Sequence, residues 1–483
     1  MLKRPPHAPR ITLPEHPRWV ELYELAWRIA LDNIERPEAP SWTPIITCMP
    51  AAGLLWAWDS CFISLFARYA GRDLPALSNL DNLYRCQGED GYISMAYRMA
   101  DSAPAYGERI NPPLFAWAEW EHYQVTGDDS RLGQVLPRLI KLFDWIQAHR
   151  RRPSGLYWFE DSGSSGMDNA PRSGYCAEHL DGSDVCFVDL ASQQALAARC
   201  IAHIAGHQGD AQTVARFERA HAELADLVNR MHWCKRTAFY YDLFARSNPA
   251  DRHNFVNHKT VAGFWPLLAG IASDRQCDKL VEHLFNRREF WTSHPVPSLS
   301  RDDPNYDRLG GYWRGGVWAP TNYMIARGLV AYGRHREARR LAMRHLDKMA
   351  RVMDDEKWPG IWECYSPEAV RPASNGRGEL VRPNFVGWSG LGPVAMLIEN
   401  VLGLELNATA NRITWRLAGA GERGIENLCF NGGTVALHAA AGRKGQWHLL
   451  CETEKSLELA LAEADGKVTA CRSLSAGRSE FVI

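Results

Sequence analysis

Residues 187–231 read FVDLASQQALAARCIAHIAGHQGDAQTVARFERAHAELADLVNRM and carry the pattern on which the fold prediction rests. Apolar residues recur every three or four positions over 187–207 and again over 211–231, which is typical of amphipathic helices. Gly209 and Asp210 lie in the short link between the two segments, and such residues end one helix and begin the next. This stretch therefore predicts a helical hairpin.

The same apolar spacing recurs along most of the chain. It predicts twelve helices, near 17–35, 57–71, 75–86, 112–126, 130–150, 187–207, 211–231, 257–272, 275–288, 317–332, 335–353 and 386–402. Short links alternate with six long loops, which cover 36–56, 87–111, 151–186, 232–256, 289–316 and 354–385. Six helical hairpins joined in this way predict a mainly α protein, an (α/α)6 toroid whose long loops gather on one face and form the site. A tandem helical repeat is the alternative, but no repeated motif supports it.

The pattern changes after about residue 403. Short alternating segments at 412–417, 434–438, 446–451 and 456–461 predict strands that are separated by glycine-rich turns. We therefore expect two domains, an (α/α)6 catalytic domain over 1–402 and a small β-rich module over 403–483.

Composition narrows the class of protein. The formal net charge of the 483 residues is −1, which gives no global field to attract nucleic acid or a membrane, so neither is predicted as a partner. No apolar leader opens the sequence, and no pair of its twelve cysteines is spaced C-x-x-C. We expect a cytoplasmic protein, and the oligomeric state stays open. The 19 tryptophans hint at a carbohydrate site, where flat rings contact sugars.

Several long loops combine aromatic, acidic and glycine residues. Asp168, Asn169 and Arg172 lie in the Gly/Ser-rich stretch 161–172. Another loop places Glu363 between aromatic residues. A third places Asp59 at a helix start, where an N-cap is the simpler interpretation. Two carboxylates across a pocket are the minimum for glycoside hydrolysis, one as proton donor and one to activate water.

Six sequence motifs resemble those of a known family. They are Trp56-Ala-Trp-Asp-Ser60, Asn111-Pro-Pro113, Ser165-Gly-Met-Asp-Asn-Ala-Pro-Arg172, Tyr312-Trp-Arg-Gly315, Trp362-Glu-Cys-Tyr365 and Phe385-Val-Gly-Trp-Ser-Gly-Leu-Gly-Pro393. In this order they resemble glycoside hydrolase family 63, which contains processing α-glucosidases and mannosylglycerate and glucosylglycerate hydrolases and is related to the trehalases.

The resemblance implies an inverting hydrolase of an α-linked glucoside or mannoside, with Asp168 as general acid and Glu363 as general base. The residues that it implies for substrate binding are Trp58, Asp59, Asn169, Arg172, Trp313, Arg314, Trp318, Trp362, Tyr365 and Trp388. Arg314 has a structural alternative, in which it only pairs with an aspartate. No cofactor and no metal ion is predicted. Asp302, Asp303 and Asp307 could hold calcium, but a solvated acidic loop is favoured.

The substrate is less well defined. Ala51-Ala-Gly-Leu-Leu55 and Tyr312-Trp-Arg314 depart from the trehalase pattern, so trehalose is less favoured than another short α-glycoside. A sugar–glycerate substrate would need a basic group for its carboxylate, and Arg109, Arg172, Arg371 and Arg377 are candidates.

Two other functions stay open. A sugar epimerase or isomerase on the same toroid would use a histidine pair, for which the loops offer His179, His253, His258 and His294. A non-catalytic glycan-binding protein would keep the aromatic residues without an opposed pair of carboxylates.

Overall fold

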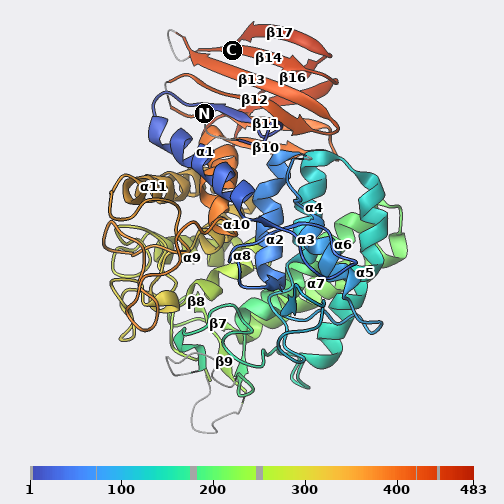
Figure 1. Cartoon of the computed structure of the whole chain (residues 1–483), viewed down its shortest axis with the longest axis vertical. Helices are drawn as coiled ribbons and strands as arrows, with labels where there is room; N and C mark the ends of the chain where they lie inside the picture. Colours follow the sequence, from blue (N-terminus) through green and yellow to red (C-terminus); the bar gives the residue numbers. More distant parts are fainter. Residues whose placement is uncertain (1–3, 72, 174–181, 246–253, 420, 443–445) are drawn as a thin grey trace.

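The computed structural model describes residues 4–71, 73–173, 182–245, 254–419, 421–442 and 446–483. It has a helical body and a β module that lies at one end of this body, beside both chain termini (Figure 1). In the described part of the chain, no helix is long and apolar enough to cross a membrane.

Each of the twelve segments that the sequence marks as helical contains a helix. Six of these alternate along the chain and form an inner layer: α2 (Ala57–Ala67), α4 (Phe115–Thr126), α6 (Val188–His207), α8 (Trp265–Ala269), α10 (Ala319–Ala331) and η6 (Gly392–Leu402). The other six form an outer layer: α1 (Pro17–Asp32), α3 (Ser78–Arg85), α5 (Asp129–His149), α7 (Ala211–Met231), α9 (Asp274–Leu284) and α11 (His335–Met353).

The inner layer closes on itself. Along the series α2, α4, α6, α8, α10 and η6 each helix contacts the next, and η6 contacts α2 again. Outer helices pack on this ring, α7 on α6 and α11 on both α10 and η6. Burial follows the layers, because every residue of α2 and of η6 is buried, whereas α7 buries only one apolar stripe.

Two inner elements are shorter than the sequence predicts. Within 257–272 a 3₁₀ turn, Val261–Phe264, precedes α8, and Gly270 ends the helix in a left-handed conformation. Within 386–402 a further 3₁₀ turn, Ser389–Leu391, precedes the π-helical η6, which begins where Pro393 fits a first turn.

The β module consists of two sheets. The five-stranded sheet has the order β1 (Arg10–Thr12), β12 (Arg423–Phe430), β13 (Gly433–Ala441), β14 (Trp447–Thr453) and β17 (Gly477–Val482). The four-stranded sheet has the order β10 (Leu404–Asn407), β11 (Arg412–Arg416), β15 (Leu457–Ala462) and β16 (Val468–Leu474), in which only β11 and β15 run parallel. Because β1 pairs with β12, the module takes one strand from the region that the sequence assigns to the helical domain.

Contacts with the β module show in which direction the inner helices run. Leu402 ends η6 two residues before β10 begins, and the carbonyls of Gln124 and Val125 at the end of α4 accept hydrogen bonds from Ala408 and Asn431 of the module. The C-terminal ends of these inner helices therefore face the β module, and the loops that precede the inner helices lie at the opposite end.

A buried ion-pair network ties the inner helices together. Arg68 lies directly after α2 and donates to Glu121 of α4 at 3.0 Å and to Glu399 of η6 at 2.8 Å. Arg327 of α10 pairs with the same two glutamates. Each of the four charges has two partners in this network. Substitution of one member would destabilise the fold, because it leaves a buried charge with fewer partners.

Candidate active site

A pocket of about 210 Å³ lies among the loops that precede the inner helices, at the end away from the β module. It is lined by Met49, Trp56, Trp58, Asp59, Met95, Tyr106, Asn111, Gly163, Gly166, Asp168, Tyr312, Trp313, Glu363, Arg382, Phe385 and Trp388. We call it the active-site pocket. Of the residues implied by the sequence, it brings together Asp168, Glu363, Trp58, Asp59, Trp313 and Trp388.

The two candidate catalytic carboxylates share this pocket. Burial raises the pKa of the Tyr312 hydroxyl well above its usual value, and the charges of Glu363 and Asp168 raise it further. Their charges therefore act on one phenol from two loops that are far apart in the sequence. Ser162 fixes the Asp168 segment, because its hydroxyl donates to the backbone carbonyl of Asp168 at 2.5 Å.

Glu363 is almost fully buried, at 2% exposure. Its Oε1 accepts hydrogen bonds from the Tyr312 hydroxyl at 2.9 Å and from the Arg382 guanidinium at 3.3 Å, while its Oε2 accepts from the Arg382 backbone N–H at 3.3 Å. Burial raises the pKa of Glu363 above its usual value, and Arg382 and Tyr312 oppose this effect. A base with a raised pKa that is still held as a hydrogen-bond acceptor suits proton abstraction from water.

Asp59 lies in the first turn of α2, as the sequence predicts, but the N-cap residue is Trp56, and the side chain of Asp59 lines the active-site pocket. The Cys48 thiol donates to Asp59 Oδ1 at 2.8 Å. Burial raises the pKa of Asp59 to about 7, and the charge of Glu363 adds to the effect. A carboxyl group with this pKa is about half protonated at neutral pH, so it can either accept a hydrogen bond from a sugar hydroxyl or donate one to it.

Indole rings form one wall of the pocket. Trp58 meets Trp313 and Trp388 edge to face, with ring centroids 6.4 and 6.1 Å apart. Trp318 lies behind them, stacked on Trp313 at 4.1 Å, and is completely buried. Trp318 therefore supports the wall by packing on Trp313 and does not itself line the pocket.

The loop that carries Asp168 is held by close packing. Gly166 has a φ of 77°, and a Cβ at this position would lie 3.1 Å from the Trp58 indole. Asn169 accepts a hydrogen bond from the Trp313 backbone N–H at 2.8 Å and donates to the Gly311 carbonyl at 3.0 Å. Asn169 thus joins two pocket loops through the backbone, and it does not line the pocket.

Arg172 is placed away from the pocket. It makes charge-assisted hydrogen bonds of 2.6 and 2.8 Å to Asp189 and of 2.7 and 2.8 Å to Asp242. A contact with the Met167 sulfur at 3.6 Å uses its remaining N–H. A guanidinium has five N–H donors, so none is left for a sugar. The contact with substrate that the resemblance implies for Arg172 does not agree with this placement.

Three further candidates, Arg314, Trp362 and Tyr365, do not line the pocket. Arg314 pairs with Asp307 at 3.2 Å, which is the structural alternative that the sequence left open. Trp362 donates to the Trp358 carbonyl, and the Tyr365 hydroxyl accepts the Trp362 backbone N–H at 3.1 Å. Trp362 and Tyr365 therefore shape the loop around Glu363.

The sequence reasoning missed several lining residues. Tyr312 and Phe385 stand within motifs that it quoted, so closer attention to those motifs would have found them. Arg382 stands in no motif and gave no signal, and the same holds for Cys48, which does not line the pocket but donates to Asp59. Within the described part of the chain, Arg382 is the arginine that lines the pocket, whereas Arg109 pairs with Asp161 at 2.9 Å outside it.

Loop histidines and the acidic loop are placed elsewhere. His258 pairs with Asp303 at 2.7 Å, and His294 is buried against His345 at 2.8 Å; neither lines the pocket. His179 and His253 lie outside the described residues. Asp302 pairs with Lys259, so the three acidic residues considered for calcium each have a protein partner.

Comparisons with known proteins identify the family of the chain. The family model described as "Mannosylglycerate hydrolase MGH1-like glycoside hydrolase domain" matches residues 53–377. An uncharacterized protein of Borreliella burgdorferi is 28% identical over 405 residues, which cover 82% of each chain. Mannosylglycerate hydrolase MGH1 of Selaginella moellendorffii is 33% identical over 122 residues, which span 25% of this chain and 23% of that protein.

The fold has a solved counterpart. The crystal structure of a GH63 mannosylglycerate hydrolase from Thermus thermophilus, in complex with glucose, matches with a TM-score of 0.61 at 21% identity, over 77% of this chain and 99% of the other. The family model spans more than half of the chain and includes Asp168 and Glu363. The chain therefore belongs to the mannosylglycerate hydrolase MGH1-like glycoside hydrolases of family 63 and is an enzyme of that family.

Proposed function

We propose that this enzyme hydrolyses a short α-linked glucoside or mannoside with inversion at the anomeric carbon. Asp168 is the general acid and Glu363 the general base. The observation that carries the proposal is that both carboxylates face one small, tryptophan-walled pocket, with the Tyr312 hydroxyl within reach of both charges.

The reaction follows from these positions. Asp168 gives its proton to the glycosidic oxygen as the bond to the anomeric carbon breaks. Glu363 takes a proton from a water molecule, which attacks the anomeric carbon from the other side of the sugar ring. An inverting pair needs room for this water, so we expect the two carboxyl groups to lie roughly 6.5–9.5 Å apart.

The sugar has a defined place in this proposal. Trp58, Trp313 and Trp388 offer apolar surface to the ring of the non-reducing sugar, and Asp59 accepts its hydroxyl groups. The closed inner series of helices supports assignment of the fold as an (α/α)6 toroid, with the catalytic domain over 1–402 and the β module over 403–483.

The leaving group lies toward Arg382 in this proposal. Its side chain is 57% exposed and lines the pocket beside Glu363. A guanidinium at this place suits a glycerate carboxylate, as in mannosylglycerate or glucosylglycerate. The buried thiols of Cys48, Cys61 and Cys364 support a cytoplasmic location, where thiols stay reduced.

The test is hydrolysis of a panel of α-glucosides, α-mannosides and sugar glycerates, followed by ¹H NMR so that the first anomer released is seen. We expect the β-anomer first, from an α-linked substrate. Asp168→Asn and Glu363→Gln each lower kcat by at least about 10²–10⁴-fold, whereas Glu356→Gln, an exposed carboxylate of the same loop region, retains activity. Near wild-type rates in either catalytic variant contradict its role, and a single isomerised product contradicts hydrolysis.

A further inference from the structure

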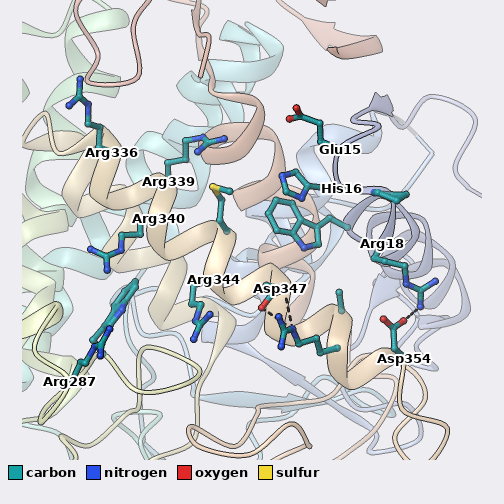
Figure 2. Close-up of a pocket in the computed structure, with 16 residues that line it drawn as sticks. Glu15, His16, Arg18, Arg287, Arg336, Arg339, Arg340, Arg344, Asp347 and Asp354 are labelled. Atoms are coloured by element: carbon teal, nitrogen blue, oxygen red, sulfur yellow. Dashed lines mark hydrogen bonds and ion pairs between the residues drawn. The ribbon is translucent and has the colours of Figure 1, made fainter. Parts of the chain in front are cut away.

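A second and larger pocket lies on the outer layer of the helical body. It has a volume of about 860 Å³ and lies between α11, the start of α1 and the segment that follows α9 (Figure 2). It shares no lining residue with the active-site pocket. We call it the arginine pocket.

Positive charge dominates this pocket, although the whole chain has a formal net charge of −1. Seven arginines line it against three carboxylates. Two of the carboxylates are neutralised within the pocket, since Asp354 pairs with Arg18 and Asp347 pairs with Arg351. Arg336 pairs outside it, with Asp465 at 3.1 Å. In the part of the chain that the structure describes, no carboxylate pairs with the remaining four, which are Arg287, Arg339, Arg340 and Arg344.

The sequence of α11 concentrates this charge. Arg336, Arg340 and Arg344 follow one another at intervals of four residues, so their side chains share one face of the helix, as Figure 2 shows. Like charges at this spacing destabilise a helix. A bound anion would remove that repulsion.

Arg339 adds a partly buried charge. Its Nε is buried and has no hydrogen-bond partner in the described structure. Burial lowers the pKa of the Arg339 guanidinium below its usual value, and Arg423 behind it is also buried, with Glu15 as its nearest carboxylate at 4.0 Å. The two buried guanidinium groups of Arg339 and Arg423 thus have the same carboxylate, Glu15, as their counter-charge, and it lies 4.0 Å from Arg423.

Aromatic surface completes the pocket. The Arg340 guanidinium lies 4.9 Å above the Trp291 ring, and His16 stacks on Trp19 at 3.8 Å. The rings hold cationic side chains in place and give flat walls. Figure 2 shows Arg340 and Arg344 on one side of the concave pocket and the paired Arg18 and Asp354 on the other, so the positive charge without a carboxylate partner is confined to one part of it, which fits a small anion better than a membrane or a duplex.

We propose that the arginine pocket binds a small molecule that carries two or more phosphate groups. Arg340 and Arg344 bind its phosphates through paired N–H donors, which guanidinium geometry favours. Arg339 contributes charge from the partly buried side. This binding site is separate from the proposed hydrolysis and does not depend on it.

The test is isothermal titration calorimetry of the full-length protein with inorganic tripolyphosphate, at constant ionic strength. We expect saturable binding near one ligand per chain. Arg340→Gln/Arg344→Gln should weaken it at least tenfold, whereas Arg219→Gln/Arg236→Gln, which removes two exposed arginines outside the pocket, should leave it unchanged. Circular dichroism and hydrolysis rates verify that both variants are folded.

Three results would overturn the proposal: no saturable binding to the wild type, equal loss in both double variants, or binding of phosphatidylserine vesicles or duplex DNA that tripolyphosphate does not displace. A parallel titration with ATP separates the sources of the phosphate groups. Tighter binding of ATP assigns a nucleotide, equal binding assigns the phosphate chain alone, and either result supports the site.

Discussion

The Tyr312 hydroxyl lies 2.9 Å from Glu363 Oε1 and donates a hydrogen bond to it. Tyr312 occupies this position with a φ of 64°, a left-handed conformation that costs a residue with a side chain on the order of 1–3 kcal/mol. Hydrogen bonds from its N–H to the Ser374 carbonyl and from the Gly316 N–H to its carbonyl hold the backbone. The fold thus holds a strained residue in contact with the proposed base.

Tyr312→Phe removes this hydrogen bond and little else. The Tyr312 hydroxyl lowers the pKa of Glu363, so without it that pKa rises further and the acidic limb of the kcat profile moves to higher pH. A hydrogen bond to a charged group contributes about 1.5–3 kcal/mol, so we expect kcat at neutral pH to fall by about 10–100-fold. The pH dependence of kcat measures both effects; an unchanged acidic limb would show that Tyr312 does not act on Glu363.

Asp59 makes the stability of the enzyme depend on pH. Its pKa is about 7 in the folded protein against an ordinary value of 3.8. Between these values the folded state binds more protons than the unfolded state, so the free energy of unfolding falls as pH rises. Asp59→Asn carries no charge, and we expect it to stabilise the protein at pH 8 by up to about 4 kcal/mol and to have no effect near pH 3.

Thermal unfolding at the two pH values measures this difference. Glu356→Gln is the control, because this carboxylate is exposed and its substitution should give no pH-dependent change in Tm. If Asp59→Asn shifts Tm equally at pH 3 and pH 8, its effect does not come from a buried charge.

Much of the helical body could be predicted from sequence because its signals are local. The apolar period over 211–231 and the Asp210 that begins the helix both act within a few residues, and the structure has α7 over the same range. β1 could not be predicted in this way. Its partner β12 lies some four hundred residues further along the chain, and three residues of extended chain carry no period of their own.

The candidate site, too, could be predicted only in part from the sequence. Motifs identified the loops that carry Asp168 and Glu363, but a motif does not say which of its residues face the pocket. Arg172 belongs to the most specific string and faces Asp189 and Asp242, while Arg382 belongs to no string and lines the pocket. Only the three-dimensional arrangement of distant loops separates these roles.

Arg172 is therefore expected to act on stability. Arg172→Met leaves Asp189 and Asp242 buried without a counter-charge, and breaking a buried ion pair costs about 3–5 kcal/mol. Arg314→Met removes one ion pair that is about 30% exposed, which is worth about 0–1 kcal/mol. Urea unfolding of both variants measures the difference. A raised KM with unchanged stability in Arg172→Met would instead restore a role in substrate binding.

The proposed role of Arg382 in binding the leaving group can be tested directly. It donates to Glu363 at 3.3 Å, and its side chain is still 57% exposed, so it can reach a second anion. Arg382→Gln alters Glu363 to the same extent for every substrate. The ratio of the fold-decreases in kcat/KM for two substrates therefore cancels this shared effect. For mannosylglycerate or glucosylglycerate, a lost charge-assisted hydrogen bond of about 1.5–3 kcal/mol should lower kcat/KM by about 10–100-fold more than for the methyl α-glycoside of the same sugar.

Steady-state kinetics on the two substrates give this ratio directly. Arg377→Gln serves as the matched control, because Arg377 is exposed on the same loop region and does not line the pocket. Its ratio should remain that of the wild type. If Arg382→Gln lowers kcat/KM by the same factor for both substrates, the guanidinium acts only on Glu363, and the proposal that it binds the carboxylate of the leaving group is wrong.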